Sequence, residues 1–442
     1  PVRSHHYDPE LTFDFCVNEP AWNNQAGIHS AFGSTDRLYF RKEVPVNHNN
    51  DLSSSYSTTV WRGERANAQI LVWSSEALEQ VRVSTQDLRS AEGNIIPKDR
   101  ITFELVRYVL SNYPYAEKKA ICGESPYKSG FLMPDRFDLP SQTTRPVWMM
   151  VDVPRGTVPG TYKGQVEVRA KGKAPQLLNL EIVVQNQLLP YPKDWKYRLD
   201  LWQNPWAVAW YNHVEPWSPE HKMLLKQHLK HYADAGGTYI TTYGVHSPWS
   251  DNSYMIEGGM IEWIKKADGT WAFDYKIFDE YVELAMECGI DEAITLYTPI
   301  PWGFRHRYKD EATGDYSYIN WAPSSEEFKK MWNIFLTDFK FHLEAKSWLD
   351  ITYIGINENP MEETLAAINV VRNHDKCWKI TYAGNWHKEL DGLLDDYSFL
   401  YGEEPTIAEQ KARAATGRTS TVYVCCTPPI PNNFVFSPPI EG

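Results

Sequence analysis

The stretch Tyr353-Ile354-Gly355-Ile356-Asn357-Glu358-Asn359-Pro360 decides how the second half of the chain is interpreted. A short apolar run stops at Asn357-Glu358, and the apolar spacing of a helix begins after Pro360. This order predicts a strand that ends on two polar side chains and then turns into a helix. In parallel α/β barrels the catalytic groups lie at that end of the strands. The same residues would also suit a plain helix start, where an acidic side chain in the first turn is favourable.

Strands and helices are predicted to alternate on both sides of this stretch. Repeated units of this length specify a parallel sheet, and we expect a (β/α)8 TIM-type barrel over residues 191–442. One strand is missing from the count, so we expect the last barrel unit to lie outside this chain. The predicted strands are Tyr197–Trp202, Thr238–Tyr243, Ala293–Tyr297, Ile351–Ile356, Lys379–Tyr382, Tyr397–Tyr401 and Thr421–Cys425. The predicted helices are Pro219–Ala235, Tyr275–Cys288, Ser325–Ala345, Pro360–Asn373, Trp386–Leu394 and Thr406–Ala415.

Residues 1–190 have a different pattern. Short period-two or apolar runs recur between turn signals, among them Ala68–Ser74, Val147–Val153 and Leu178–Val184, and no long helical segment interrupts them. This spacing predicts an all-β sandwich. The stiff segment Leu189-Pro190-Tyr191-Pro192 is the expected boundary between the two domains.

Composition excludes several classes of function. The net charge of −13 argues against a nucleic-acid partner, which needs clustered Lys and Arg. No apolar run approaches the length of a membrane span, about 18 residues. The six cysteines show no disulfide framework or metal spacing, so we expect them to be mostly free and buried. The first residues, Pro1-Val2-Arg3-Ser4, look like a processed or trimmed start.

Aromatic and polar residues gather at the expected strand ends. The chain holds 18 Trp and 26 Tyr, and such rings can stack on the apolar face of a sugar. For each ring alone, packing in the core is the simpler explanation, but clustering at one rim is harder to explain in that way. We therefore expect an aromatic-lined cup with one or two carboxylates, as glycoside hydrolysis requires. The candidate catalytic residues are Glu358 and Asn357, and the candidate substrate-binding residues are Trp202, Asn204, Tyr243, His246, Tyr297, Trp302, Asn385, Trp386 and Tyr401.

Other chemistries find little support in the sequence. His246 and His213 lack a second ligand at metal-site spacing, so we expect no metal. Arg305, His306 and Arg307 could bind a phosphate or an acidic sugar, although a solvated loop is the simpler interpretation. The dinucleotide, P-loop and nucleophile-elbow patterns are absent, and we expect no cofactor.

Two glycosidase mechanisms remain open. An Asn-Glu pair at the end of the fourth strand is also the acid/base signature of clan A retaining glycosidases, which need a second carboxylate about 5 Å from the acid. The expected seventh strand end, Tyr423–Thr427, has no carboxylate, and Glu403 and Glu404 lie on the sixth. In the alternative mechanism the 2-acetamido oxygen of the sugar attacks its own anomeric carbon. The enzyme then supplies a general acid and a neighbouring group that orients the acetamide N–H.

The chain resembles glycoside hydrolase family 123, whose members are retaining β-N-acetylgalactosaminidases that use neighbouring-group participation. The matching features are Gly63–Gln69, Pro159–Gly164 and the pair Asn357-Glu358 followed by Pro360. The resemblance implies a β-sandwich followed by a (β/α)8 barrel, and terminal β-linked GalNAc on oligosaccharide or glycolipid glycans as substrate. It also implies that Glu358 is the general acid/base, that residue 357 orients the acetamide, and that the protein is exported.

Residue 357 departs from the family pattern. The family resembles Asp-Glu-x-Pro, whereas this chain has Asn357-Glu358-Asn359-Pro360. An amide can still bond to the acetamide but cannot stabilise the cationic intermediate by charge. Loss of such stabilisation typically costs about 10² to 10³ in rate. We therefore expect an attenuated enzyme, through natural divergence or a deliberate Asp→Asn change that traps bound substrate. The alternatives are a clan A glycosidase and a catalytically inactive GalNAc-binding protein.

Overall fold

A computed structural model describes residues 19–37, 39–45, 52–111, 123–132, 136–249 and 258–424. The chain forms two compact units, one that ends at Pro190 and one that begins at Tyr191. Each unit has its own hydrophobic core. The expected end of the seventh barrel strand, Cys425-Cys426-Thr427, lies outside the described residues.

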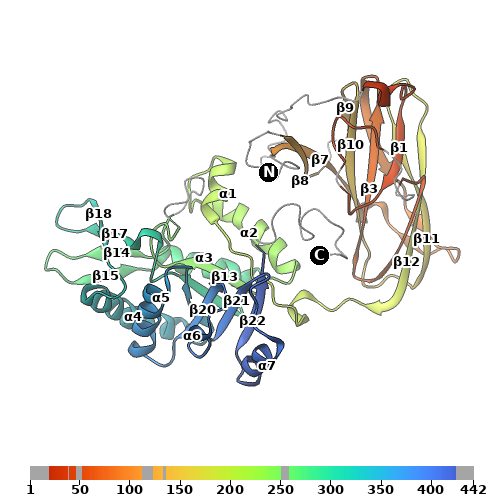
Figure 1. The fold of residues 1–442 in the computed structure, drawn as a ribbon. Helices are drawn as coiled ribbons and strands as arrows, with labels where there is room; N and C mark the ends of the chain where they lie inside the picture. The colour runs from red at the N-terminus through yellow and green to blue at the C-terminus, as the bar shows by residue number, and fades with distance from the viewer. Residues whose placement is uncertain are drawn as a thin grey trace. The chain divides into compact units, whose positions relative to one another are not determined.

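The N-terminal unit is built from two β-sheets (Figure 1). Its strands are β1 (His29–Gly33), β2 (Ser55–Arg62), β3 (Arg65–Ser74), β4 (Leu78–Thr85), β5 (Leu88–Arg89), β6 (Ile95–Ile96), β7 (Ile101–Ser111), β8 (Gly123–Leu132), β9 (Phe137–Leu139), β10 (Thr143–Asp152), β11 (Gly160–Arg169) and β12 (Gln176–Leu188). One sheet has the order β1-β3-β10-β7-β8 and the other β2-β12-β11-β4-β9, with β5 and β6 beside β11. Side chains of both sheets form one core, to which Ile70 and Val147 contribute from the first sheet and Val166 and Leu180 from the second.

The run Gly63–Gln69 braces the first of these sheets. Arg65 pairs with Asp152 on the neighbouring strand, with Nε 2.6 Å from Oδ1. Asn67 Oδ1 accepts a hydrogen bond from Trp148 Nε1 at 3.1 Å. The polar residues of this motif are therefore explained by the packing of the N-terminal unit.

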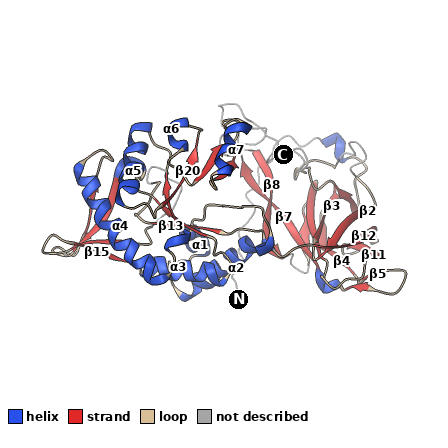
Figure 2. Ribbon diagram, turned by 90° about the horizontal axis from the view of Figure 1, so that it is seen from below, coloured by secondary structure: helices blue, strands red, loops and turns tan. Residues whose placement is uncertain are grey.

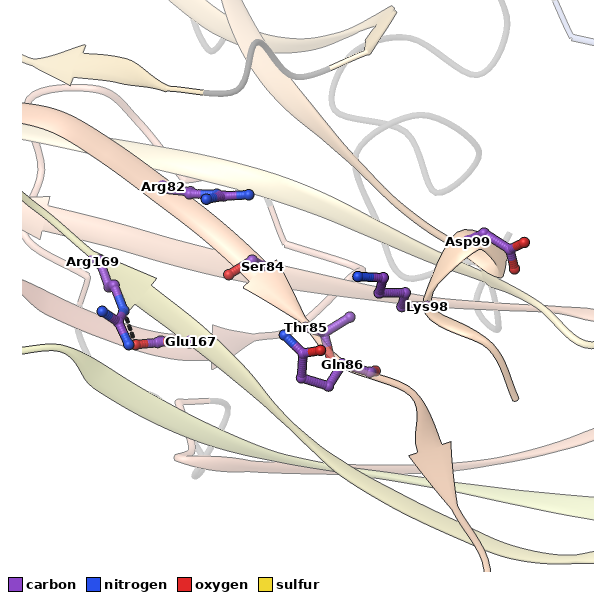
Figure 3. Close-up of a pocket in the computed structure, with 8 residues that line it drawn as sticks. All are labelled: Arg82, Ser84, Thr85, Gln86, Lys98, Asp99, Glu167 and Arg169. Atoms are coloured by element: carbon purple, nitrogen blue, oxygen red, sulfur yellow. Dashed lines mark hydrogen bonds and ion pairs between the residues drawn. The ribbon is translucent and has the colours of Figure 1, made fainter. Parts of the chain in front are cut away.

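A groove of about 500 Å³ opens on the second sheet (Figure 3). Arg82 and Arg169 are direct cross-strand neighbours there, and Arg169 is paired with Glu167. The groove is lined by Arg82, Ser84, Thr85, Gln86, Lys98, Asp99, Glu167 and Arg169. None of the predicted site residues belongs to this lining.

The C-terminal unit is built on a parallel sheet whose outer side is covered by helices (Figure 2). The strands pair in the order β13 (Tyr239–Tyr243), β16 (Ala293–Tyr297), β19 (Thr352–Ile356), β20 (Lys379–Gly384), β21 (Asp396–Leu400) and β22 (Thr419–Tyr423). The helices are α1 (Pro205–Asn212), α2 (Pro219–Asp234), α3 (Lys276–Glu287), α4 (Glu326–Lys346), α5 (Met361–His374), α6 (Lys388–Asp391) and α7 (Ile407–Ala415). Among the described residues, no helix has the length and apolar character needed to cross a membrane.

The prediction of a (β/α)8 barrel is wrong. The described part of the C-terminal unit has six parallel strands and seven helices, which form a curled half-barrel. The expected first strand, Tyr197–Trp202, makes only one bridge, between Leu199 and Gly237. Tyr197 and Leu201 remain 64% and 55% exposed, so no described residue buries the apolar face of this segment. An eighth unit is also absent from the described residues.

The two faces of the parallel sheet differ in polarity because successive residues of a strand point to opposite sides. Ile294, Ile354 and Ile380 are fully buried and share a core with aromatic side chains of α4. The opposite face carries polar side chains at the alternate positions, namely Thr241, Thr295, Thr381 and Asp396. The helices therefore cover the apolar face, and the polar face and the strand ends are left for a site.

A second sheet is inserted beyond the strand ends, and the sequence analysis did not predict it. Its order is β15 (Trp271–Asp274), β14 (Glu262–Lys265), β17 (Arg305–Asp310) and β18 (Tyr316–Asn320). The buried side chain of His306 joins it to α4, because Trp332 Nε1 donates to His306 Nε2 at 3.3 Å. Residues 305–307, expected in a solvated loop, therefore lie on a strand.

Replacing the buried arginine of α7 tests what holds the last β-α unit. The Arg413 side chain is fully buried, and Nη1 lies 2.6 Å from Oδ1 of Asp391. Because Arg413→Ala leaves Asp391 without its partner, we expect it to lower the free energy of unfolding by about 3 kcal/mol. Urea unfolding measures the change. Arg418→Ala, which removes only long bonds to the backbone of Asp391 and Gly392, is the matched control. If both variants lose the same free energy of unfolding, the Arg413–Asp391 pair is not what stabilises this unit.

Candidate active site

Glu358 lies at the carboxyl end of β19 with an exposed side chain. Its Oε1 accepts a hydrogen bond from Tyr423 Oη at 2.7 Å. Tyr423 is the last residue of β22, and two strands separate β22 from β19 in the sheet. A flat sheet would hold these strands about 14 Å apart, since each spacing is about 4.8 Å. The curl of the sheet is therefore what brings this tyrosine to the carboxyl group.

Asn357 is buried beside Glu358, with 2% of its surface exposed. Its Nδ2 donates to the carbonyl oxygen of Pro248 at 3.4 Å, while its Oδ1 has no hydrogen-bond partner among the described residues. The same carbonyl accepts from the backbone N–H of Trp302 at 2.9 Å. A buried acceptor without a partner costs about 1–3 kcal/mol. Asn357 therefore presents an amide oxygen that is suited to a donor from a ligand.

His246 is held neutral in the loop that follows β13. Burial lowers the pKa of its imidazole to about 4, and the charges of Arg307 and Arg305 add to this effect. Its Nε2 lies 3.4 Å from Arg307 Nη1 and accepts from it. The proton of the neutral ring is then on Nδ1, a buried atom with no hydrogen-bond partner in the described part of the chain. Like Asn357, His246 has a polar atom that a ligand could satisfy.

Three of the predicted aromatic residues come together at the first strand ends. The Trp202 ring lies 4.8 Å from that of Tyr297 and 5.3 Å from that of Trp249. Tyr243 also packs against Trp249, at 5.5 Å. Tyr243 and Tyr297 are 1% exposed, whereas Trp202 is 47% exposed. Of these rings, Trp202 therefore has the exposed surface that a ligand could contact.

The remaining predicted residues lie at the same edge but make different contacts. Asn204 caps α1, where its side chain accepts from the backbone N–H of Ala207 at 3.3 Å. Asn385 and Trp386 are both connected to Tyr397, the first through its carbonyl oxygen and the second through ring packing at 5.4 Å. The backbone N–H of Tyr401 donates to the carbonyl oxygen of Tyr423 at 2.8 Å, next to the partner of Glu358.

Three contributors to this arrangement were not predicted as site residues. Tyr423 was considered only as part of a strand end without a carboxylate, Pro248 acts through its backbone carbonyl, and Arg307 contacts His246 from the inserted sheet. The one available signal was the position of Tyr423 at the end of a predicted strand. A contact made by a backbone carbonyl cannot be predicted from residue types, and the contact of Arg307 with His246 depends on tertiary packing.

Among the described residues, no cluster of three or more His, Cys, Asp or Glu side chains could hold a metal ion. The arrangement instead offers a carboxyl group, a buried amide oxygen and aromatic surface, which suit proton transfer to a bound sugar.

Comparisons with known proteins agree with this chemistry. Residues 202–442 match the description "Glycoside hydrolase 123, catalytic domain", and residues 32–170 match "Glycoside hydrolase 123 N-terminal domain". The chain belongs to glycoside hydrolase family 123. This family 123 chain is therefore a glycosidase, and the predicted family resemblance is confirmed.

A solved structure supports the same assignment. This family 123 chain is similar to a family 123 glycoside hydrolase from Clostridium perfringens, described for its hydrolysis of glycolipid glycans, with 26% identity and a TM-score of 0.82. The similarity covers 94% of this chain and 75% of the other. A family 39 glycoside hydrolase from Bacteroides cellulosilyticus (13% identity, TM-score 0.27, covering 73% and 58% of the two chains) is too distant to carry an argument. No curated protein sequence matches this chain.

We expect acidification to destabilise this family 123 chain between pH 6.5 and 4. In the folded state burial holds the pKa of His246 near 4, whereas an unfolded histidine binds its proton at about 6.5. The unfolded chain then binds more protons in this interval, so stability that is present above pH 6.5 is lost as the pH falls through 4. Urea-unfolding midpoints at pH 7 and pH 4.5 measure the loss.

The variant His246→Gln should show a smaller loss than the unsubstituted chain. His306, whose pKa burial also lowers to about 4, contributes in the same direction and is retained in this variant. An unchanged pH dependence would show that folding does not lower the pKa of His246.

Proposed function

We propose that the chain removes terminal non-reducing β-linked N-acetylgalactosamine from glycans by substrate-assisted, retaining hydrolysis. The acetamide oxygen of the substrate attacks the anomeric carbon while the bond to the leaving oxygen breaks, and Glu358 gives its proton to that oxygen. Water then adds to the anomeric carbon of the oxazolinium ion, and Glu358 takes a proton back. Asn357 accepts the N–H of the acetamide.

The unpartnered Oδ1 of Asn357 carries this proposal. A backbone carbonyl holds the amide nitrogen, so the buried oxygen is directed away from it and has no acceptor role within the described protein. An acetamide N–H is a donor of the right kind for it. Glu358 follows directly in the chain and has an exposed carboxyl group, as a group that meets a leaving oxygen requires.

The surroundings of Glu358 favour a fixed carboxyl group. Tyr423 donates to it, and Tyr382 is close enough for its charge to matter: burial, and then the charge of Glu358, raise the pKa of Tyr382 to about 12. Tyr382 therefore keeps its hydroxyl proton at neutral pH. The rings of Trp202 and Trp302 are the expected surface for the sugar, together with the polar groups of His246, Asn385 and Tyr401.

The substrate class rests on the family and on its solved member. The Clostridium perfringens enzyme is described for glycolipid glycans. We extend this class to the present chain, with a terminal GalNAc whose acetamide supplies the nucleophile. Activity is expected to be weak because an amide at position 357 lacks the charge that stabilises the oxazolinium ion.

Restoring a carboxylate at position 357 tests the assigned role. We expect Asn357→Asp to raise kcat on an aryl β-GalNAc substrate by about 10² to 10³, because the added charge stabilises the cationic intermediate. Steady-state hydrolysis measures the change, and Glu358→Gln in the same background should remove it. An Asn357→Asp variant that binds GalNAc but stays inert would instead identify a sugar-binding protein.

A thiazoline that mimics the cyclised acetamide separates the two hydrolytic mechanisms. Neighbouring-group participation predicts competitive inhibition, because the compound resembles the intermediate. A covalent glycosyl adduct on the protein, found by mass spectrometry, would favour the two-carboxylate mechanism.

Removing the hydroxyl of Tyr423 tests how the acid is positioned. We expect Tyr423→Phe to lower kcat on the aryl substrate about tenfold, since a hydrogen bond to a charged group contributes about 1.5–3 kcal/mol. The substitution is measured in the Asn357→Asp background, where turnover is largest. Tyr197→Phe, at a 64% exposed position away from the predicted site residues, is the matched control. A kcat that Tyr423→Phe leaves unchanged would refute the positioning role.

A further inference from the structure

The outer face of the inserted sheet carries two arginines and two tyrosines. β17 and β18 pair antiparallel, with Arg307 opposite Tyr318 and Lys309 opposite Tyr316. Because side chains alternate along a strand, Arg305, Arg307, Tyr316 and Tyr318 share one face. His306, between the two arginines, points to the other face and is buried.

These four side chains form a ladder of planar groups. The Arg305 guanidinium carbon lies 3.7 Å from the centroid of the Tyr318 ring, and that of Arg307 lies 4.2 Å from the Tyr316 centroid. Such cation–π contacts hold the planar groups in place. Tyr316 and Tyr318 are nevertheless 51% and 48% exposed. Half of each ring surface therefore remains open to a ligand.

Glu262 on β14 fixes the inner end of the ladder. Its Oε2 accepts from Tyr316 Oη at 3.1 Å and lies 3.9 Å from Arg307 Nη2. Side chains that are already ordered lose little conformational entropy when a ligand binds. These contacts therefore fix the tyrosine side chains and leave part of each ring exposed.

The ladder is connected to the candidate active site by direct contacts. Arg307 Nη1 bonds to His246 Nε2 at 3.4 Å, in the loop that also contains Pro248. Pro248 in turn accepts from Asn357 and from Trp302 through its carbonyl oxygen. The ladder therefore lies next to the loops that contact Asn357.

We propose that this ladder binds the sugars on the reducing side of the GalNAc residue that is removed. The tyrosine rings would stack on the C–H faces of pyranose rings, and the N–H groups of Arg305 would donate to sugar hydroxyls. The inference rests on the proposed function, because it places the remainder of the same glycan beside the cleaved bond. Stabilisation of the hairpin alone would explain the Arg–Tyr pairs, but it would not require half-exposed rings next to the catalytic edge.

Hydrolysis of a long and a short substrate tests the proposal. The variant with Tyr316→Ala and Tyr318→Ala is compared with the unsubstituted chain on a GalNAcβ-terminated tetrasaccharide and on an aryl β-GalNAc. We expect the ratio of kcat/KM for the tetrasaccharide to that for the aryl substrate to fall about tenfold, because two large apolar ring surfaces are lost. Phe341→Ala is the control, because this ring is 68% exposed near the end of α4 that leads to the opposite edge of the sheet. A ratio that stays constant would overturn the proposal.

A binding measurement separates failure of the ladder from failure of the proposed function. The trisaccharide core that lacks the terminal GalNAc is titrated into the full chain and into the double variant, and isothermal calorimetry reports the affinity. Loss of core binding in the double variant supports the ladder even if no substrate is cleaved, and equal affinities refute it. Arg305→Lys, which keeps the charge but loses the planar group, should weaken core binding by a smaller factor than the double variant. Unchanged unfolding midpoints show that each variant is folded.

Discussion

In-register parallel pairing from β13 to β22 is the constraint on which the C-terminal unit depends. It places the carboxyl ends of all six strands at one edge, and burial of the alternate apolar residues under the helices fixes which face turns inward. A shift of one residue would exchange the polar and apolar faces. The curl of the same sheet then carries Tyr423 across two strands to Glu358.

The sequence predicted the parts that follow from local pattern. Apolar runs located all six parallel strands within a few residues, and the predicted helices Pro219–Ala235 and Ser325–Ala345 correspond to α2 and α4. Asn357 and Glu358 were chosen as candidate catalytic residues because a strand was predicted to end on two polar residues before a helix, and both follow β19 directly. The family motif Gly63–Gln69 was recognised correctly, although its polar side chains brace the N-terminal sheet and do not form a site.

What the sequence missed depends on contacts between distant segments. Tyr197–Trp202 has the pattern of a strand, but it makes one isolated bridge and no described residue buries its exposed side chains, so the strand count was too high for the described part of the chain. The inserted sheet was hidden because its strands are only four to six residues long and carry charged residues between the aromatic ones. The roles of Pro248 and Arg307 arise from tertiary contacts that no local signal encodes, and the approach of Tyr423 to Glu358 depends on the curl of the sheet.

The contact between Asn357 and Pro248 has a consequence for what this position can tolerate. The amide nitrogen is the atom that faces the carbonyl oxygen at 3.4 Å, in a buried setting. A carboxylate of the same shape would set oxygen against oxygen there and would lose the hydrogen bond that the amide nitrogen donates. In the proposed mechanism a negative charge at position 357 serves the cationic intermediate, so the stability of the ligand-free protein and turnover would favour opposite choices there.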